Sequence, residues 1–243
     1  MRPDGFTLAA TTNDLTREPE VRDVADVVEF RMDKAEDPLE QLAEYDGDLA
    51  LLATNRGRAF GGEAAEAGRV DDLSTAAAFD CVELVDVELE VVRERDEVVP
   101  AFRDGGVDVV VSHHDFDGTP DAESLDAIFE ECARYGDVAK VATLAETTGD
   151  ALGMLNAVHR ATSEGKRVAG IAMGGVGSHT RVVAPLYGSR LGYAPLASDT
   201  SEYAPGQLSI RTLATMIETL GSPDRHGADF PDEDTAASNG VVD

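Results

Sequence analysis

Short apolar runs alternate with longer amphipathic segments along most of the chain. The runs are four to eight residues long and are bounded by glycine, proline, asparagine or aspartate, which is typical of buried β-strands. Strands are predicted at Phe6–Thr11, Val27–Asp33, Leu49–Asn55, Val82–Leu89, Asp108–His114, Asp137–Leu144, Val168–Met173 and Leu191–Ala194. Helices are predicted from Asn13 or Asp14 to Ala25, at Asp37–Tyr45, from Asp71 or Asp72 to Phe79, and at Glu94–Asp104, Asp121–Tyr135, Gly149–Ser163 and Gln207–Leu220.

This alternation predicts an α/β protein with a single (β/α)8 barrel, the TIM barrel. The 243 residues of the chain match the roughly 250 that such a barrel needs. The barrel is expected to span residues 1–220, and the acidic residues 221–243 are expected to form a disordered tail. The alternative is an open doubly wound sheet, but no G-x-G-x-x-G follows the first strand.

The formal net charge of −28 limits the classes of partner. Acidic residues occur along the whole chain, so they indicate either adaptation to concentrated salt or partial disorder. The regular apolar strands and the presence of only three lysines favour salt adaptation. Without a basic stripe, neither nucleic acid nor an anionic membrane surface is expected as a partner. The sequence also lacks an apolar run of ~18 residues and a signal-like start, so a cytoplasmic protein is expected.

One of the three lysines, Lys140, lies in the middle of the sixth predicted strand. Burying an ammonium group is unfavourable unless the group is paired or loses its proton. An arginine could not act as a nucleophile there, whereas a lysine can form an imine with a ketone or aldehyde. The alternative is a lysine at a strand end that extends its amine to solvent. This segment alone leaves both interpretations open.

Other polar residues fall near the ends of the predicted strands, where a barrel places its active site. Histidine can transfer a proton near neutral pH, and arginine binds a carboxylate through two hydrogen bonds. Together with Lys140, this set predicts imine chemistry on a polyhydroxylated keto acid. The histidines lack H-x-H or H-E-x-x-H spacing, so no metal and no cofactor is expected. The strand-end residues are Glu29, Arg31, Arg56, Asp86, Glu88, His113, His114, His179 and Arg181.

Several ordered motifs resemble the type I 3-dehydroquinate dehydratases of the shikimate pathway. The resemblance covers about Phe6 to Ser209 and implies a cofactor-free hydro-lyase of aromatic amino-acid and chorismate biosynthesis, commonly a homodimer. The motifs are Glu29-Phe30-Arg31-Met32-Asp33, Thr54-Asn55-Arg56, Asp86-Val87-Glu88-Leu89, Ser112-His113-His114-Asp115-Phe116 with Thr119-Pro120, Lys140, Arg181 with Tyr187-Gly188-Ser189, and Ala204-Pro205-Gly206-Gln207.

The resemblance also implies roles for individual residues. Lys140 would form the imine with the C3 ketone of 3-dehydroquinate, and His114 would take the C2 proton and assist loss of the C1 hydroxyl as water. Arg181 would bind the substrate carboxylate. The remaining substrate-binding candidates are Glu29 and Arg31 for the ring hydroxyls, Arg56, Gln207 and Tyr203, with Asp86 and Glu88 behind them.

Three positions depart from the pattern of this family. The family often has a glutamate four residues after the arginine of the third strand, where this chain has Phe60. Either Glu63, the next acid, orients the histidine or the histidine is held in another way. Tyr203 stands where a serine is common, and Tyr193 provides the aromatic ring that is common after the glycine–serine pair.

Two other functions are consistent with parts of the sequence. The first is a different imine-forming barrel, such as an aldolase or a transaldolase, which would share the lysine on the sixth strand. Glu29, Arg31 and the Ala204–Gln207 segment would have no role in such an enzyme. The second is a non-catalytic barrel that binds a metabolite or a partner, an interpretation that only the missing glutamate supports.

Overall fold

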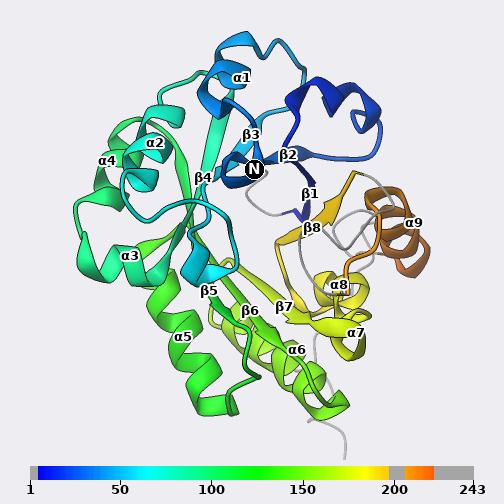
Figure 1. Cartoon of the computed structure of the whole chain (residues 1–243). Coiled ribbons are helices and arrows are strands. Elements are labelled where there is room, and N and C mark those ends of the chain that lie inside the picture. Colours follow the sequence, from blue (N-terminus) through cyan, green and yellow to red (C-terminus); the bar gives the residue numbers. More distant parts are fainter. Residues whose placement is uncertain (1–4, 197–205, 222–243) are drawn as a thin grey trace, which may run out of the picture.

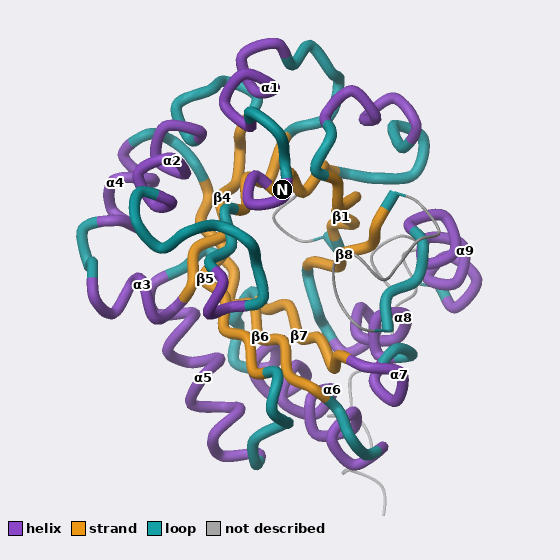
Figure 2. The backbone as a smooth tube through the Cα atoms, viewed as in Figure 1, coloured by secondary structure: helices purple, strands orange, loops and turns teal. Residues whose placement is uncertain are grey.

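Eight parallel strands form the centre of the protein (Figures 1 and 2). The structure, a computed structural model, describes residues 5–196 and 206–221. The strands are hydrogen-bonded in the order β7-β6-β5-β4-β3-β2-β1-β8, and the N–H of Arg190 donates to the carbonyl of Val168 at 2.7 Å where β8 approaches β7. The predicted barrel is thereby confirmed. The strands are β1 (Thr7–Thr12), β2 (Val27–Arg31), β3 (Leu51–Thr54), β4 (Val82–Glu88), β5 (Asp108–Asp115), β6 (Val138–Leu144), β7 (Val168–Met173) and β8 (Leu191–Pro195).

Helices follow the strands along the chain and lie around them (Figure 2). The α-helices are α1 (Pro38–Glu44), α2 (Arg69–Ala76), α3 (Leu89–Glu94), α4 (Val98–Asp104), α5 (Ala122–Tyr135), α6 (Thr148–Ser163), α7 (Gly174–Gly177), α8 (Thr180–Val183) and α9 (Ile210–Leu220). Short 3₁₀ helices are η1 (Leu15–Glu20), η2 (Met32–Lys34), η3 (Arg58–Phe60) and η4 (Ala184–Tyr187).

The predicted helix from residue 13 or 14 to residue 25 is wrong. Only η1 forms there, followed by a turn. Asp14 is its N-cap and accepts a hydrogen bond from the N–H of Thr16 at 3.0 Å. Pro19, inside η1, lacks the N–H that a continuing helix would need, which explains why the segment stays short.

Two further helix predictions need correction. Helix α2 begins after Gly68, which adopts a left-handed conformation with φ of 84°, so Asp71 and Asp72 lie in its first turn and do not cap it. Carboxylates there still favour the positive end of the helix dipole. The helix predicted at 94–104 begins only at Val98, and a separate helix, α3, starts directly after β4. Residues 180–189, which carried no prediction, form α8 and η4 with Pro185 in the first turn of η4.

The two-residue period of the strands divides the core into two parts. In β6, Ala139 and Val141 pack with the surrounding helices, whereas Val138 and Ala142 belong to the cluster inside the barrel. Lys140 lies between Val138 and Ala142 and therefore points into the barrel. The alternation of inward-facing and outward-facing positions along β6 thus places the amine of Lys140 inside the barrel.

The remaining features of the fold bear on the other sequence predictions. Cys132 is a buried free thiol, and Cys81, also free, is half-buried. Among the described residues, none of the helices combines the length and apolarity needed to span a bilayer. The predicted tail starts at Gly221, and residues 222–243 lie outside the described residues.

We expect the stability of the fold to depend on salt. The chain has 48 acidic and 20 basic residues, so folding brings many like charges together. The Debye length shortens from roughly 30 Å at 0.01 M to roughly 3 Å at 1 M salt, which removes most of this repulsion. The thermal midpoint, followed by circular dichroism, should fall as the salt is diluted. An equal midpoint in dilute buffer and in molar salt would contradict the proposed salt adaptation.

Candidate active site

A single cavity at the carboxyl ends of the strands contains most of the predicted site residues. Glu29 and Arg31 reach it from β2, His114 from β5 and Lys140 from β6. The segments that follow the strands add further polar side chains. The cavity is also lined by Arg56, Phe60, Phe116, Arg181, Tyr193 and Gln207. Tyr203 lies outside the described residues.

The amine of Lys140 is held between a carboxylate and an aromatic ring. Lys140 is 5 % exposed, and its Nζ donates to Oδ2 of Asp86 at 2.9 Å. The same Nζ lies 3.9 Å from the centre of the Tyr193 ring. Both neighbours stabilise a positive charge at this atom. Lys140 therefore does not extend to solvent, which was the alternative that the sequence left open.

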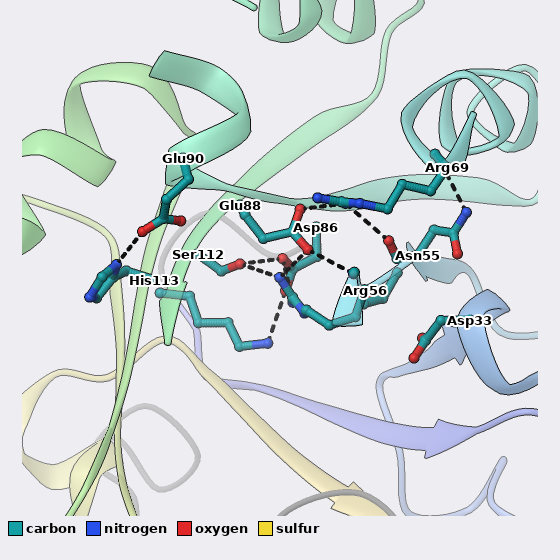
Figure 3. A network of polar contacts seen from close by, with 12 residues as sticks. Asp33, Asn55, Arg56, Arg69, Asp86, Glu88, Glu90, Ser112 and His113 are labelled. Atoms are coloured by element: carbon teal, nitrogen blue, oxygen red, sulfur yellow. Dashed lines mark hydrogen bonds and ion pairs between the residues drawn. The ribbon is translucent and has the colours of Figure 1, made fainter. Parts of the chain in front are cut away.

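Asp86 is the centre of a buried polar network (Figure 3). Its Oδ1 accepts from Ser112 at 2.6 Å and pairs with Arg56 at 2.7 Å. Burial by itself would raise the pKa of this carboxyl, but Arg56 and Lys140 outweigh burial and hold the pKa well below its usual range. Asp86 is therefore ionised at neutral pH and directly contacts the candidate nucleophile.

Glu88 supports this network from the next inward position of β4. It pairs with Nη1 of Arg56 at 3.2 Å and with Nη1 of Arg69 at 2.8 Å. Burial opposes the charge of Arg56, yet Asp86 and Glu88 raise its pKa, so the guanidinium stays protonated. The network places a fixed positive charge beside the carboxyl ends of β3, β4 and β5.

The imidazole of His114 is suited to accept a proton. Burial, together with the nearby charges of Arg56 and Lys140, lowers the pKa of His114 well below the ordinary value of 6.5. The ring is therefore neutral at neutral pH. It stacks on Phe116 with the ring centres 6.1 Å apart, and its Nδ1 has no hydrogen-bond partner among the described residues.

The adjacent His113 points away from the cavity. Its Nδ1 lies 2.8 Å from Oε1 of Glu90, which belongs to α3 on the outside of the barrel (Figure 3). Successive residues of a strand face opposite sides, so only one of the two histidines can face the cavity. The structure assigns this position to His114.

The loop after β3 explains how His114 is held without the glutamate that is common in the family. Phe60 lines the cavity, and Glu63 instead accepts from Nζ of Lys34 at 2.7 Å. The Phe116 ring packs on Gly61, where an added Cβ would lie 2.4 Å from the ring and where φ is +80°. Aromatic packing on a left-handed glycine thus supports the imidazole.

The cavity also presents groups suited to a hydroxylated anion. Glu29 accepts from Thr11 at 2.7 Å and from Thr54 at 3.3 Å, and Arg31 forms a two-point pair with Asp33. Arg181 is 7 % exposed and has no carboxylate partner in the described part of the chain. Burial lowers its pKa to about 10, so it is still a cation at neutral pH.

The structure also adds residues that sequence reasoning did not assign to the site. Thr11 donates to Glu29 in the cavity, and Ser112 donates to Asp86 behind it. Phe116 contacts His114, and Tyr193 contacts Lys140. Ser112 could have been found from the two-residue strand period, because it lies on the same face of β5 as His114. The positions of Phe116 and Tyr193 depend on loop conformation and on a very short strand.

These groups share one cavity of a (β/α)8 barrel, an arrangement suited to an enzyme that attacks a carbonyl compound with an amine. Comparison with known proteins narrows the class. The sequence profile of the type I 3-dehydroquinase family matches residues 7–224, so the chain belongs to this family. The resemblance seen in the motifs is confirmed, as is the expected class of enzyme, a hydro-lyase, and the aldolase and non-catalytic alternatives are set aside.

Individual relatives agree with the family match over nearly their whole length. The 3-dehydroquinate dehydratase of Haloarcula marismortui is 47% identical over 90% of this chain and 98% of the relative. That of Halobacterium salinarum is 45% identical over 88% of this chain and 97% of the relative. The crystal structure of the 3-dehydroquinate dehydratase from Geobacillus kaustophilus superposes with a TM-score of 0.79 at 31% identity, covering 88% and 90% of the two chains.

Proposed function

We propose that this chain dehydrates 3-dehydroquinate to 3-dehydroshikimate through an imine on Lys140. The observation that carries the proposal is the position of the Lys140 amine inside the barrel. It shares one cavity with the neutral imidazole of His114 and with the cation of Arg181, for which the described residues offer no counterion. A nucleophile, a base and an anion-binding group are what this reaction requires.

The polar groups of the cavity place the substrate in one orientation. Arg181 binds the carboxylate, since it is the buried cation that lacks a counterion in the described part of the chain. Glu29 accepts hydrogen bonds from the ring hydroxyls and Arg31 donates hydrogen bonds to them, while Arg56 and Gln207 complete the polar contacts. This orientation brings the C3 ketone to Lys140.

The reaction begins with the amine of Lys140. After losing a proton it adds to C3, and the carbonyl oxygen leaves as water when the imine forms. The protonated imine is a cation, and Asp86, 2.9 Å from Nζ, stabilises it. The positive nitrogen withdraws electrons from C2 and makes the C2 protons more acidic.

His114 then carries the proton between the two sites of bond cleavage. Its neutral ring accepts a proton from C2, and the electron pair moves toward the imine nitrogen to form an enamine. Return of this pair expels the C1 hydroxyl, which leaves as water with the proton that His114 donates. A water molecule then adds to the imine carbon, releases the product and restores the amine of Lys140.

Borohydride trapping tests the proposal directly. The protein is incubated with 3-dehydroquinate in molar salt, reduced, digested and analysed by mass spectrometry. A stable adduct on Lys140 is expected, because reduction converts the imine into an amine that cannot be hydrolysed. If a control enzyme is trapped under the same salt and this chain is not, the imine mechanism is wrong.

Phe60→Glu should shift the pH dependence of the reaction. The acid limb of kcat/KM reports the pKa of the base in the free enzyme. In the unchanged protein the pKa of His114 lies well below 6.5. A carboxylate in the wall of the same cavity favours the charged imidazole and raises its pKa. The acid limb of the variant should therefore move upward by about one pH unit.

Phe60→Leu is the matched control, because it changes the ring without adding charge. Its acid limb should coincide with that of the unchanged protein. If Phe60→Glu and Phe60→Leu give the same profile, position 60 does not influence the proton acceptor electrostatically.

The wider setting of the enzyme follows from its relatives. We propose a role in the shikimate pathway, and hence in chorismate and aromatic amino-acid biosynthesis, in a salt-adapted cytoplasm. Nucleic acid is not proposed as a partner, since a net charge of −28 repels phosphates. The family resemblance supports a homodimer, and sedimentation equilibrium in molar salt would measure the mass of the assembly.

A further inference from the structure

Tyr193 enters the cavity from β8 and lies next to the candidate nucleophile. It is 4 % exposed, belongs to the apolar cluster inside the barrel, and is opposite Ala9 of β1 in the sheet register. Its ring face lies 3.9 Å from Nζ of Lys140. The ring is therefore fixed relative to the amine.

The hydroxyl of Tyr193 is buried and has no hydrogen-bond partner among the described residues. Burial raises its pKa well above 10, and the charges of Asp86 and Glu29 add to this effect. The hydroxyl thus keeps its proton and can act as a donor. The nearby carboxylates already accept other hydrogen bonds, Asp86 from Lys140, Arg56 and Ser112, and Glu29 from Thr11 and Thr54.

Three other polar atoms of the same cavity also have no partner in the part of the chain that the structure describes. They are Nδ1 of His114, Nε of Arg181 and Oε1 of Gln207. Buried polar groups are nearly always hydrogen-bonded, and exceptions gather where a ligand supplies the partner. The cavity that these four side chains share indicates that the missing partners belong to its occupant.

We propose that the Tyr193 hydroxyl donates a hydrogen bond to the substrate hydroxyl on the carbon next to the reacting ketone. This inference rests on the proposed function. Because Nζ lies over the face of the ring, the hydroxyl at the edge of the ring is close to any carbon joined to Nζ and within reach of a substituent on the carbon next to it. Tyr193 is then a specificity-determining residue that favours α-hydroxy ketones over α-deoxy ketones.

The variant Tyr193→Phe removes the hydroxyl and keeps the ring. With 3-dehydroquinate, kcat/KM should fall about tenfold, the usual effect of losing one hydrogen bond to a ligand. With the analogue that has hydrogen in place of the C4 hydroxyl, kcat/KM should be equal for the two proteins. Tyr187→Phe is the control, since Tyr187 is 42% exposed and its hydroxyl lies outside the cavity lining.

Thermal unfolding without ligand separates this role from a structural one. Removing an unpartnered buried hydroxyl should leave the thermal midpoint unchanged or raise it. A lower midpoint, an equal loss with both substrates, or an unchanged kcat/KM with 3-dehydroquinate would each overturn the inference. Failure of the proposed function would look different, because the unchanged protein itself would then give no borohydride adduct on Lys140.

Discussion

Lys140→Met is expected to abolish turnover while leaving the fold intact. Methionine has a side chain of similar length but offers no amine, so the imine cannot form. Removing a covalent nucleophile typically lowers kcat by roughly 10⁴-fold to 10⁶-fold. The rate of 3-dehydroshikimate formation, followed by the absorbance of its conjugated double bond, measures the loss. Borohydride should no longer attach the substrate to the protein.

The fold of this variant should survive because Asp86 keeps its second buried cation. Asp86 retains its pair with Arg56 at 2.7 Å and its hydrogen bond from Ser112. Lys166→Met is the matched control, since Lys166 pairs with Glu130 at 2.7 Å away from the cavity and has no role in the chemistry. Lys140→Met protein that keeps a tenth of the activity, with normal circular dichroism, would show that another group attacks the ketone.

Most of the site could be predicted from the sequence because two simple rules act together. Parallel strands present their carboxyl ends at one edge, so polar residues that end successive runs come together. The two-residue period then decides which side chains face inward, as it does for Lys140 between Val138 and Ala142. These rules need only the strand positions, and all eight predicted strands are present.

The parts that sequence could not supply depend on contacts between distant segments. Asp86 on β4 and Lys140 on β6 are in direct contact because their two side chains together are long enough to meet inside the barrel. His114 is supported by the ring of Phe116, which in turn packs against the left-handed turn at Gly61. Local patterns carry no information about such distances.

Asp86→Asn should produce the largest loss of stability among single changes in the site. Asp86 is fully buried and faces two buried cations, Arg56 and Lys140. Asparagine keeps the size of the side chain but removes the charge that compensates them. Breaking a buried ion pair in this way costs about 3–5 kcal/mol of unfolding free energy. Urea denaturation at constant molar salt measures the difference.

Lowering the pH distinguishes this charge effect from a packing defect. The pKa of Asp86 is lowered in the folded protein, so its contribution is fully present above the unfolded value of about 3.9 and is lost as the pH falls toward the folded value. The stability gap between the two proteins should therefore narrow only below about pH 4. Asp126→Asn makes the same chemical change in an exposed pair with Arg160, where surface screening limits the effect to about 0–1 kcal/mol. Equal losses in the two variants would mean that the buried network does not depend on the charge of Asp86.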